Sequence, residues 1–178
     1  MILPSHGPIY KNPNFILDLY EDWTAEEGKN LVLLPYVSMY NSTEEMIDYI
    51  AEKLGEKGIR TKVFDIVTGD LGDLAMALVD ATTIVLGSSM VLAGPHPMAV
   101  NVAYLANILK PKAKFATFVG SYGWGGNLFG TLGQMLSGLK VETIEPVLVK
   151  GKPKKEDYEK LDILIEEIYN KHKSLNLV

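Results

Sequence analysis

The chain has 178 residues, 47% of them hydrophobic, which suits one domain with a packed core plus a short appendage. The formal net charge of -5 argues against nucleic-acid binding, because such proteins normally present a basic face. The absence of cysteine excludes disulfides, thiolate zinc sites, cysteine nucleophiles and Cys-ligated iron–sulfur clusters. The sequence has no signal-peptide pattern and no apolar run long enough for a membrane span, so we expect a cytoplasmic protein without membrane contact.

The N-terminal part predicts a loop followed by one helix. The first residues are rich in Pro and Gly, and Asn12 followed by Pro13 is typical of a helix N-cap and first helical position. Apolar side chains then recur at helical spacing as far as Trp23. We therefore expect residues 1–28 to be the remnant of a preceding domain plus a connector helix, and residues 29–178 to form the main domain.

From residue 29 onward, short apolar runs alternate with segments of helical periodicity. Strands are expected at 31–36, 61–66, 82–86, 115–119 and 141–149, the last with an irregularity at Pro146. Helices are expected from a cap at Thr43 to Leu54, and at 71–79, 98–109, 128–136 and 154–171. This alternation predicts an α/β fold in which a five-stranded parallel sheet, in the order 2-1-3-4-5, has helices on both faces.

Three segments that follow predicted strands carry the residue types of a ligand site. In an open parallel sheet, ligands bind outside the carboxyl ends of the strands, so three such segments can surround one ligand. Residues 38–43 are rich in hydroxyls and open a helix, which suits a phosphate. Residues 88–97 and 121–127 combine glycine with apolar or aromatic residues, which suits a flat ring. The candidate binding residues are Ser38, Met39, Tyr40, Asn41, Ser42, Thr43, Ser88, Ser89, Met90, Val91, Leu92, Ala93, Gly94, Ser121, Tyr122, Gly123, Trp124, Gly125 and Gly126.

Each segment also has a purely structural interpretation. The first is compatible with a Ser/Thr helix cap, the second with a long strand–helix connection, and the third with a tryptophan that packs on a neighbouring helix. The first segment contains neither the Gly-x-x-x-x-Gly-Lys pattern of a triphosphate loop nor the Gly-x-Gly-x-x-Gly pattern of a dinucleotide loop. The combination of the three segments is much more specific than any one of them.

At these residues the chain resembles the flavodoxin-like domain of the flavodiiron proteins, or A-type flavoproteins. Residues 38–43 are similar to the family's phosphate loop, usually Ser-Met-Tyr-Gly-Asn-Thr, and residues 121–126 are similar to its second flavin loop. Asn41 stands where the family commonly has Gly, and Asn tolerates a positive φ better than other non-Gly residues. The resemblance implies a flavodoxin-like three-layer sandwich that binds FMN through the three segments and transfers electrons.

The N-terminal segment extends this resemblance. Residues 2–10 resemble the end of the family's metallo-β-lactamase-like domain, where His6 matches the last iron ligand. The His-x-Glu-x-Asp cluster that supplies most diiron ligands in the family does not occur here. The resemblance therefore implies a fragment or one half of a split protein, in which His6 binds a metal only if a partner chain supplies the other ligands. The implied partners are a redox protein or a metallo-β-lactamase-like diiron chain, together with self-association into a homo-oligomer.

These observations lead to one main functional interpretation and two alternatives. The main one is an FMN-binding electron-transfer domain that resembles the electron-donating half of an oxygen or nitric oxide reductase, with reductase activity only beside a diiron partner. The first alternative is a stand-alone NAD(P)H-dependent FMN or quinone reductase, and the second is a flavin-free interaction module. We expect His96 to be a rigid loop residue near the flavin and His172, in a charged tail, to be solvated.

Overall fold

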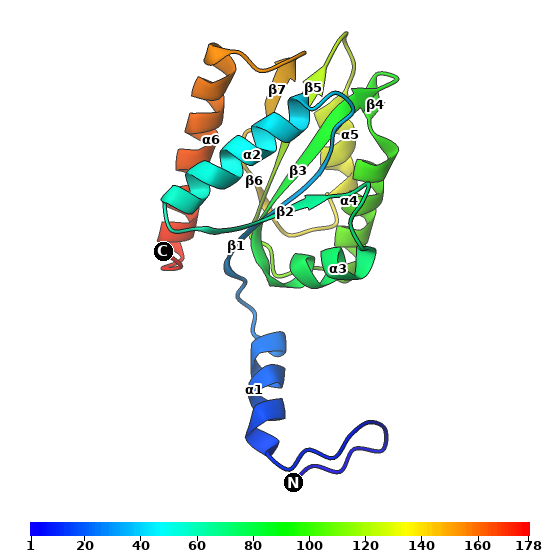
Figure 1. The fold of residues 1–178 in the computed structure, drawn as a ribbon, viewed down its shortest axis with the longest axis vertical. Helices are drawn as coiled ribbons and strands as arrows, with labels where there is room; N and C mark the ends of the chain where they lie inside the picture. The colour runs from blue at the N-terminus through cyan, green and yellow to red at the C-terminus, as the bar shows by residue number, and fades with distance from the viewer.

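The computed structural model describes the backbone of residues 1–178 and all side chains except those of Phe129 and Met135. A sheet covered by helices forms the main body, and residues 1–27 project from it as an arm (Figure 1). The arm contains an isolated bridge between Ile2 and Tyr10, followed by α1 (Pro13–Thr24). As predicted, Asn12 is the N-cap of this helix, and its side chain accepts a hydrogen bond from the backbone N–H of Asn14. None of the described helices has both the length and the apolar character that a membrane span requires.

The central sheet is parallel except for one short hairpin. Its strands are β1 (Lys29–Val37), β2 (Arg60–Asp65), β3 (Ala81–Val91), β4 (Gly94–Pro95), β5 (Phe115–Tyr122), β6 (Glu142–Thr143) and β7 (Val147–Lys150). The order is β2-β1-β3-β5-β6; β7 also pairs with β5, and β4 pairs antiparallel with β3. The predicted fifth strand is interrupted around Pro146 and gives β6 and β7, which pair with successive parts of β5. With these two counted as one position, the order is the predicted 2-1-3-4-5.

Helices cover both faces of the sheet, which completes the predicted three layers (Figure 1). One face carries α2 (Ser42–Glu56) and α6 (Lys155–Ser174), and the other carries α3 (Leu71–Asp80), α4 (Pro97–Leu109) and α5 (Leu128–Met135). Successive side chains of a strand point to opposite faces. In β1, Leu33 therefore joins the core beneath α3, α4 and α5, while Val32 and Leu34 join the core beneath α2 and α6.

Two strands extend at least three residues beyond their predicted carboxyl ends. β3 and β5 were expected to end near residues 86 and 119, yet they stay paired until Ser89 lies opposite Ser121. Gly120 permits this close pairing, because a Cβ atom there would lie 2.6 Å from the carbonyl oxygen of Ser88. Consequently Ser88, Ser89 and Ser121 belong to the sheet rather than to loops.

The expectation that His172 is solvated is wrong, because the side chain is fully buried on the inner face of α6. Its Nε2 atom lies 2.8 Å from Thr83 Oγ1 and its Nδ1 atom 2.9 Å from Asn30 Oδ1. An amide oxygen only accepts hydrogen bonds, so Nδ1 carries the proton and donates to Asn30, while the Thr83 hydroxyl donates to Nε2. Burial lowers the pKa of His172 to about 4, so the ring is neutral at pH 7.

Candidate functional site

The three predicted segments meet at one cavity of about 350 Å³, outside the carboxyl ends of β1, β3 and β5. We call it the three-loop cavity. It is lined by Met39, Tyr40, Ser42, Ser89, Met90, Ser121, Tyr122, Gly123, Trp124 and Gly151. Each of the three segments supplies part of this lining, so residues far apart in the sequence surround a single space. The position agrees with the general rule for ligands of parallel sheets.

The first segment turns into α2 at Asn41, which has φ 63° and ψ -5°. This is the left-handed conformation that the Asn-for-Gly replacement was expected to tolerate. The helix begins at the next residue, so the prediction that Thr43 is its N-cap is wrong: a left-handed residue makes the turn instead. Within the described structure, the Asn41 side chain makes no capping hydrogen bond. The N–H groups of the first helical turn are therefore available to an anion.

Hydroxyl side chains lie at the ends of the three adjacent strands. Thr43 Oγ1 lies 3.1 Å from Ser121 Oγ and thus joins the first segment to the third. The Oγ atoms of Ser38 and Ser89 are buried and have no hydrogen-bond partner among the described residues. A buried polar group without a partner costs about 1–3 kcal/mol. Ser89 lines the cavity, and Ser38 directly precedes the lining residue Met39, so both hydroxyls are suited to a polar ligand there.

The second segment is a hairpin that β3 forms with β4. Its two turn residues, Leu92 and Ala93, both have positive φ, at 47° and 66°. The Leu92 side chain is 91% exposed, and residues 91–94 do not line the three-loop cavity. Below the hairpin, the buried Ser88 hydroxyl accepts a hydrogen bond from the His96 N–H. His96 in turn is the N-cap of α4, where its Nδ1 atom accepts from the Met98 N–H.

The second and third segments touch at Ala93. The Asn127 N–H donates to the Ala93 carbonyl oxygen at 2.9 Å. A Cβ atom on Gly126 would lie 2.4 Å from that same oxygen. Only glycine fits where the backbones of the two segments come this close, which explains one of the three glycines around Trp124. The predicted binding residues Ala93 and Gly126 thus hold two segments together rather than line the cavity.

Trp124 lies at the edge of the cavity with 74% of its surface exposed. Nothing lies within 4 Å of the position that a Cβ atom would take on Gly123 or on Gly125. Because 74% of its surface is exposed, the indole is not packed on a neighbouring helix, as the structural alternative required. An apolar side chain this exposed beside a cavity is suited to cover a flat ligand.

Gly151 is the lining residue that the sequence analysis missed. It follows β7, has φ 71°, and donates its N–H to the Tyr122 carbonyl oxygen at 2.8 Å. Gly before Lys152 and Pro153 is a turn signal in the sequence. Only the pairing of β7 with β5 places that turn at the cavity, and this pairing has no local signal.

The lining residues match the chemistry of FMN. The lining contains no Asp, Glu, Lys, Arg or His, and it combines hydroxyls, aromatic rings and methionines next to a helix N-terminus. Such a site offers neutral donors to a phosphate and apolar cover to a ring. His6 is exposed on the distant arm, and the described residues contain no group of three or more potential metal ligands.

Comparison with known proteins is consistent with this geometry. Residues 34–161 match the flavodoxin family. The chain is 32% identical over 162 residues to a nitric oxide reductase from Moorella thermoacetica, a match that covers 89% of this chain and 41% of the relative. Its structure is similar to rubredoxin oxygen:oxidoreductase from Desulfovibrio gigas, with a TM-score of 0.84, 26% identity, and coverage of 90% and 40%. The flavodiiron protein from Giardia intestinalis shares the fold, with a TM-score of 0.82, 16% identity, and coverage of 93% and 42%.

These relatives confirm the resemblance to the flavodoxin-like part of flavodiiron proteins. The chain spans about two fifths of their length. The matched family region contains the carboxyl end of β1, together with β3, β5 and the three segments around the cavity. The chain therefore belongs to the flavodoxin family.

Proposed function

We propose that the chain is an electron-transfer domain that holds FMN in the three-loop cavity. Membership in the flavodoxin family confirms FMN as the expected cofactor. The placement of FMN in this cavity rests on one observation: the hydroxyls of Ser38 and Ser89 have no partner among the described residues, and they lie beside a cavity that no charged residue lines. FMN supplies one- and two-electron chemistry when bound. The protein's part is to bind and orient the cofactor.

The residues divide into two groups by chemistry. The N–H groups at the start of α2, with the hydroxyls of Ser38, Ser42 and Thr43, would hold the phosphate. Tyr122 and Trp124 would cover the ring and keep water from it. No side chain is required as an acid or a base, because the redox chemistry belongs to the cofactor. The other predicted residues that line the cavity complete its wall; they are Met39, Tyr40, Ser89, Met90, Ser121 and Gly123.

The identity of the flavin is the first test. We expect the purified chain, after reconstitution, to bind one FMN and to release FMN rather than FAD, since the cavity joins one helix N-terminus and no second phosphate site. The measurement is an absorption spectrum followed by chromatography of the released flavin. Release of FAD, or no flavin uptake, would contradict the proposal. Rapid NAD(P)H oxidation by the FMN-loaded chain alone would instead favour the stand-alone reductase.

Replacement of Trp124 with alanine tests the ring cover. We expect FMN affinity to fall about tenfold, because an aromatic contact contributes about 0.5–1.5 kcal/mol beyond the area it buries. The reduction potential should rise, because water then reaches the ring and favours its charged reduced form. Fluorescence titration and potentiometry measure both effects. Trp23→Ala is the matched control, since Trp23 is also exposed but lies on the arm. Equal behaviour of the two variants would remove Trp124 from the site.

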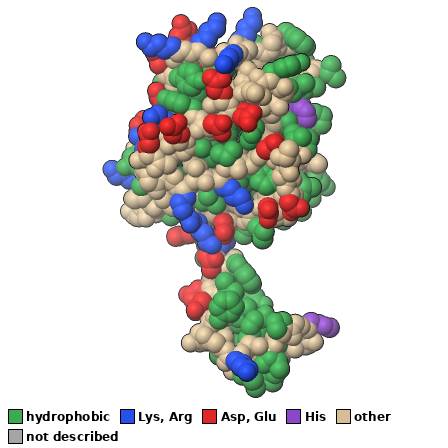
Figure 2. Space-filling view, in the orientation of Figure 1, with side chains coloured by type: hydrophobic (Ala, Val, Ile, Leu, Met, Phe, Trp, Pro, Cys, Tyr) green, Lys and Arg blue, Asp and Glu red, His purple; other side chains and the backbone are tan. Residues whose placement is uncertain are grey.

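The arm supports a proposal about partners. Hydrophobic side chains gather on it (Figure 2), and Phe15, Tyr20 and Trp23 are each more than half exposed. We propose that a metallo-β-lactamase-like diiron domain, on another chain or another copy, covers this surface, and that His6 completes its metal site. Oxygen or nitric oxide reduction would require that partner, in the cytoplasm. Sedimentation and iron analysis test this: two iron atoms per isolated chain, or a strict monomer that reduces no iron protein, would contradict it.

A further inference from the structure

The Gly151 turn, residues 150–153, forms a fourth side of the three-loop cavity. It contributes Gly151 to the lining and is tied to the third segment by the hydrogen bond from the Gly151 N–H to Tyr122. Lys150 is also the last residue of β7 and lies in register with Tyr122 of β5. The turn leaves the sheet after this point, so the sheet alone does not fix its remaining residues.

A carboxylate on α2 reaches this turn from the opposite side. Glu45 Oε2 lies 3.3 Å from Lys152 Nζ, and Glu45 Oε1 accepts a hydrogen bond of 2.7 Å from the Tyr158 hydroxyl of α6. The Glu45 N–H donates to the carbonyl oxygen of Asn41, the left-handed residue of the first segment. Glu45 therefore connects the first segment, the Gly151 turn and α6.

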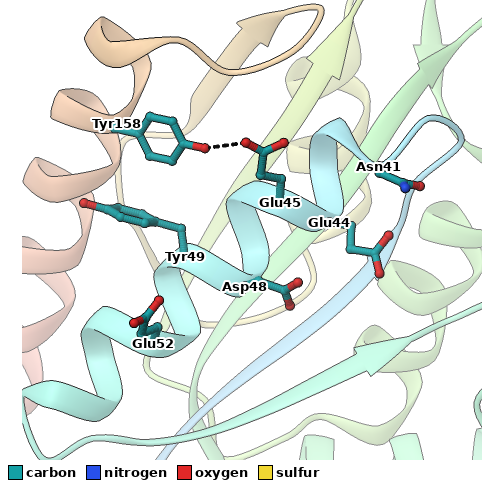
Figure 3. Close-up of a pocket in the computed structure, with 7 residues that line it drawn as sticks. All are labelled: Asn41, Glu44, Glu45, Asp48, Tyr49, Glu52 and Tyr158. Carbon is teal, nitrogen blue, oxygen red and sulfur yellow. Dashed lines mark hydrogen bonds between the residues drawn. The ribbon is translucent and has the colours of Figure 1, made fainter.

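Figure 3 shows Glu45 and Tyr158 in the groove between α2 and α6. Tyr158 points from α6 to Glu45, and Asn41 lies at the start of α2. The hydrogen bond from Tyr158, with Lys152 beside it, holds the pKa of Glu45 below its usual range, so this carboxylate is ionised at pH 7. The same hydrogen bond raises the pKa of Tyr158 to about 12, so the phenol keeps its proton and remains the donor.

A second tyrosine makes the same kind of bond in the reverse direction. Tyr49 of α2 donates to Asp162 of α6 at 2.6 Å, and its ring meets that of Tyr158 edge to face with centroids 4.8 Å apart. Both bonds join α2 to α6. Only the bond from Tyr158 ends on the residue that also contacts the Gly151 turn.

We propose that Glu45 is a positioning residue that holds the Gly151 turn against the first segment and thereby slows the release of FMN. It is not among the residues that line the three-loop cavity, so it acts through its partners. The bond from Tyr158 fixes the carboxylate, and the carboxylate restrains Lys152. This inference rests on the proposed FMN site. The restraint on the turn passes through the ion pair with Lys152, whose side chain is 76% exposed, so water and salt limit the size of the effect.

The experiment compares Tyr158→Phe with Tyr49→Phe in the FMN-loaded chain. Each variant loses one hydrogen bond between the same two helices, so we expect similar decreases in the free energy of unfolding. Only Tyr158→Phe should raise the FMN dissociation rate, by about twofold to fivefold, because its effect reaches the turn through one exposed ion pair. Glu45→Gln and Lys152→Gln should raise the rate by a similar factor, because each removes that ion pair.

The outcomes separate this inference from the proposed function. If the unmodified chain binds no FMN, both are overturned. If it binds FMN but Tyr158→Phe and Tyr49→Phe release it at the same rate, only the positioning role is overturned. Should Tyr158→Phe fail to fold, Glu45→Gln measured against Glu52→Gln, a carboxylate further along the same groove, gives the same decision.

Discussion

Replacement of Gly126 with alanine is expected to weaken FMN binding by about tenfold to a hundredfold. The added Cβ would lie 2.4 Å from the carbonyl oxygen of Ala93 and 2.6 Å from its Cα. These are backbone atoms of a two-residue turn, so they cannot turn aside as a flexible side chain does. Overpacking of this kind costs about 1–3 kcal/mol, and the hydrogen bond from Asn127 to Ala93 would be lost as well. The second and third segments would then separate at the cavity.

Fluorescence titration with FMN measures this effect, and Gly125→Ala provides the matched control. Nothing lies within 4 Å of a Cβ at Gly125, so this variant should bind FMN as the unmodified chain does. The two substitutions add the same methyl group to neighbouring residues of one segment. If both variants bind with equal affinity, contact between the two segments does not shape the site.

The second large effect concerns the pH dependence of stability. His172 has a pKa near 6.5 when unfolded and about 4 in the folded protein, because burial disfavours its charged form. The contribution of neutral His172 to the free energy of unfolding is fully present above pH 6.5. It decreases as the pH falls toward 4, because the unfolded chain binds a proton at a higher pH than the folded chain does. The loss over this range is roughly 3 kcal/mol. Protonation would also place a donor on Nε2, which now accepts from Thr83.

Urea unfolding at pH 7 and pH 4 measures this contribution as a difference between variants. Carboxylates also titrate in this range, but they do so equally in every variant. The unmodified chain should therefore lose roughly 3 kcal/mol more than His172→Gln. His6→Gln, which alters an exposed histidine of the arm, should behave like the unmodified chain. Equal losses in all three proteins would show that His172 does not titrate as described.

The layers and strand order were predictable from the sequence, because parallel strands that are buried on both faces appear in it as short runs of apolar residues. The three segments at the strand ends were also predictable, since their residue types and their positions after predicted strands are visible in the sequence. The contacts between these segments were not predictable. The approach of Gly126 to Ala93 and the place of Gly151 beside Tyr122 depend on pairing between distant parts of the chain.

His172 shows a different limit. It continues the inner row of α6 four residues after Ile168, and this periodicity was visible in the sequence. The neighbouring Lys171 and Lys173 suggested a solvated tail instead. What decided its burial was the availability of two polar partners, Thr83 and Asn30, on separate strands. Likewise, Leu92 and Ala93 form a turn with positive φ although neither residue type favours it, so composition carried no signal.

The arm has a thermodynamic consequence for any partner. α1 has 12 residues and no buried side chain, and helices of this length are only marginally stable in water on their own. A surface that covers Phe15, Tyr20 and Trp23 would therefore stabilise the helix in the same step as it forms the interface. Folding of the arm and association are then linked equilibria. A change that weakens only the helix, such as loss of the Asn12 cap, would lower affinity for the partner without altering any atom of the contact.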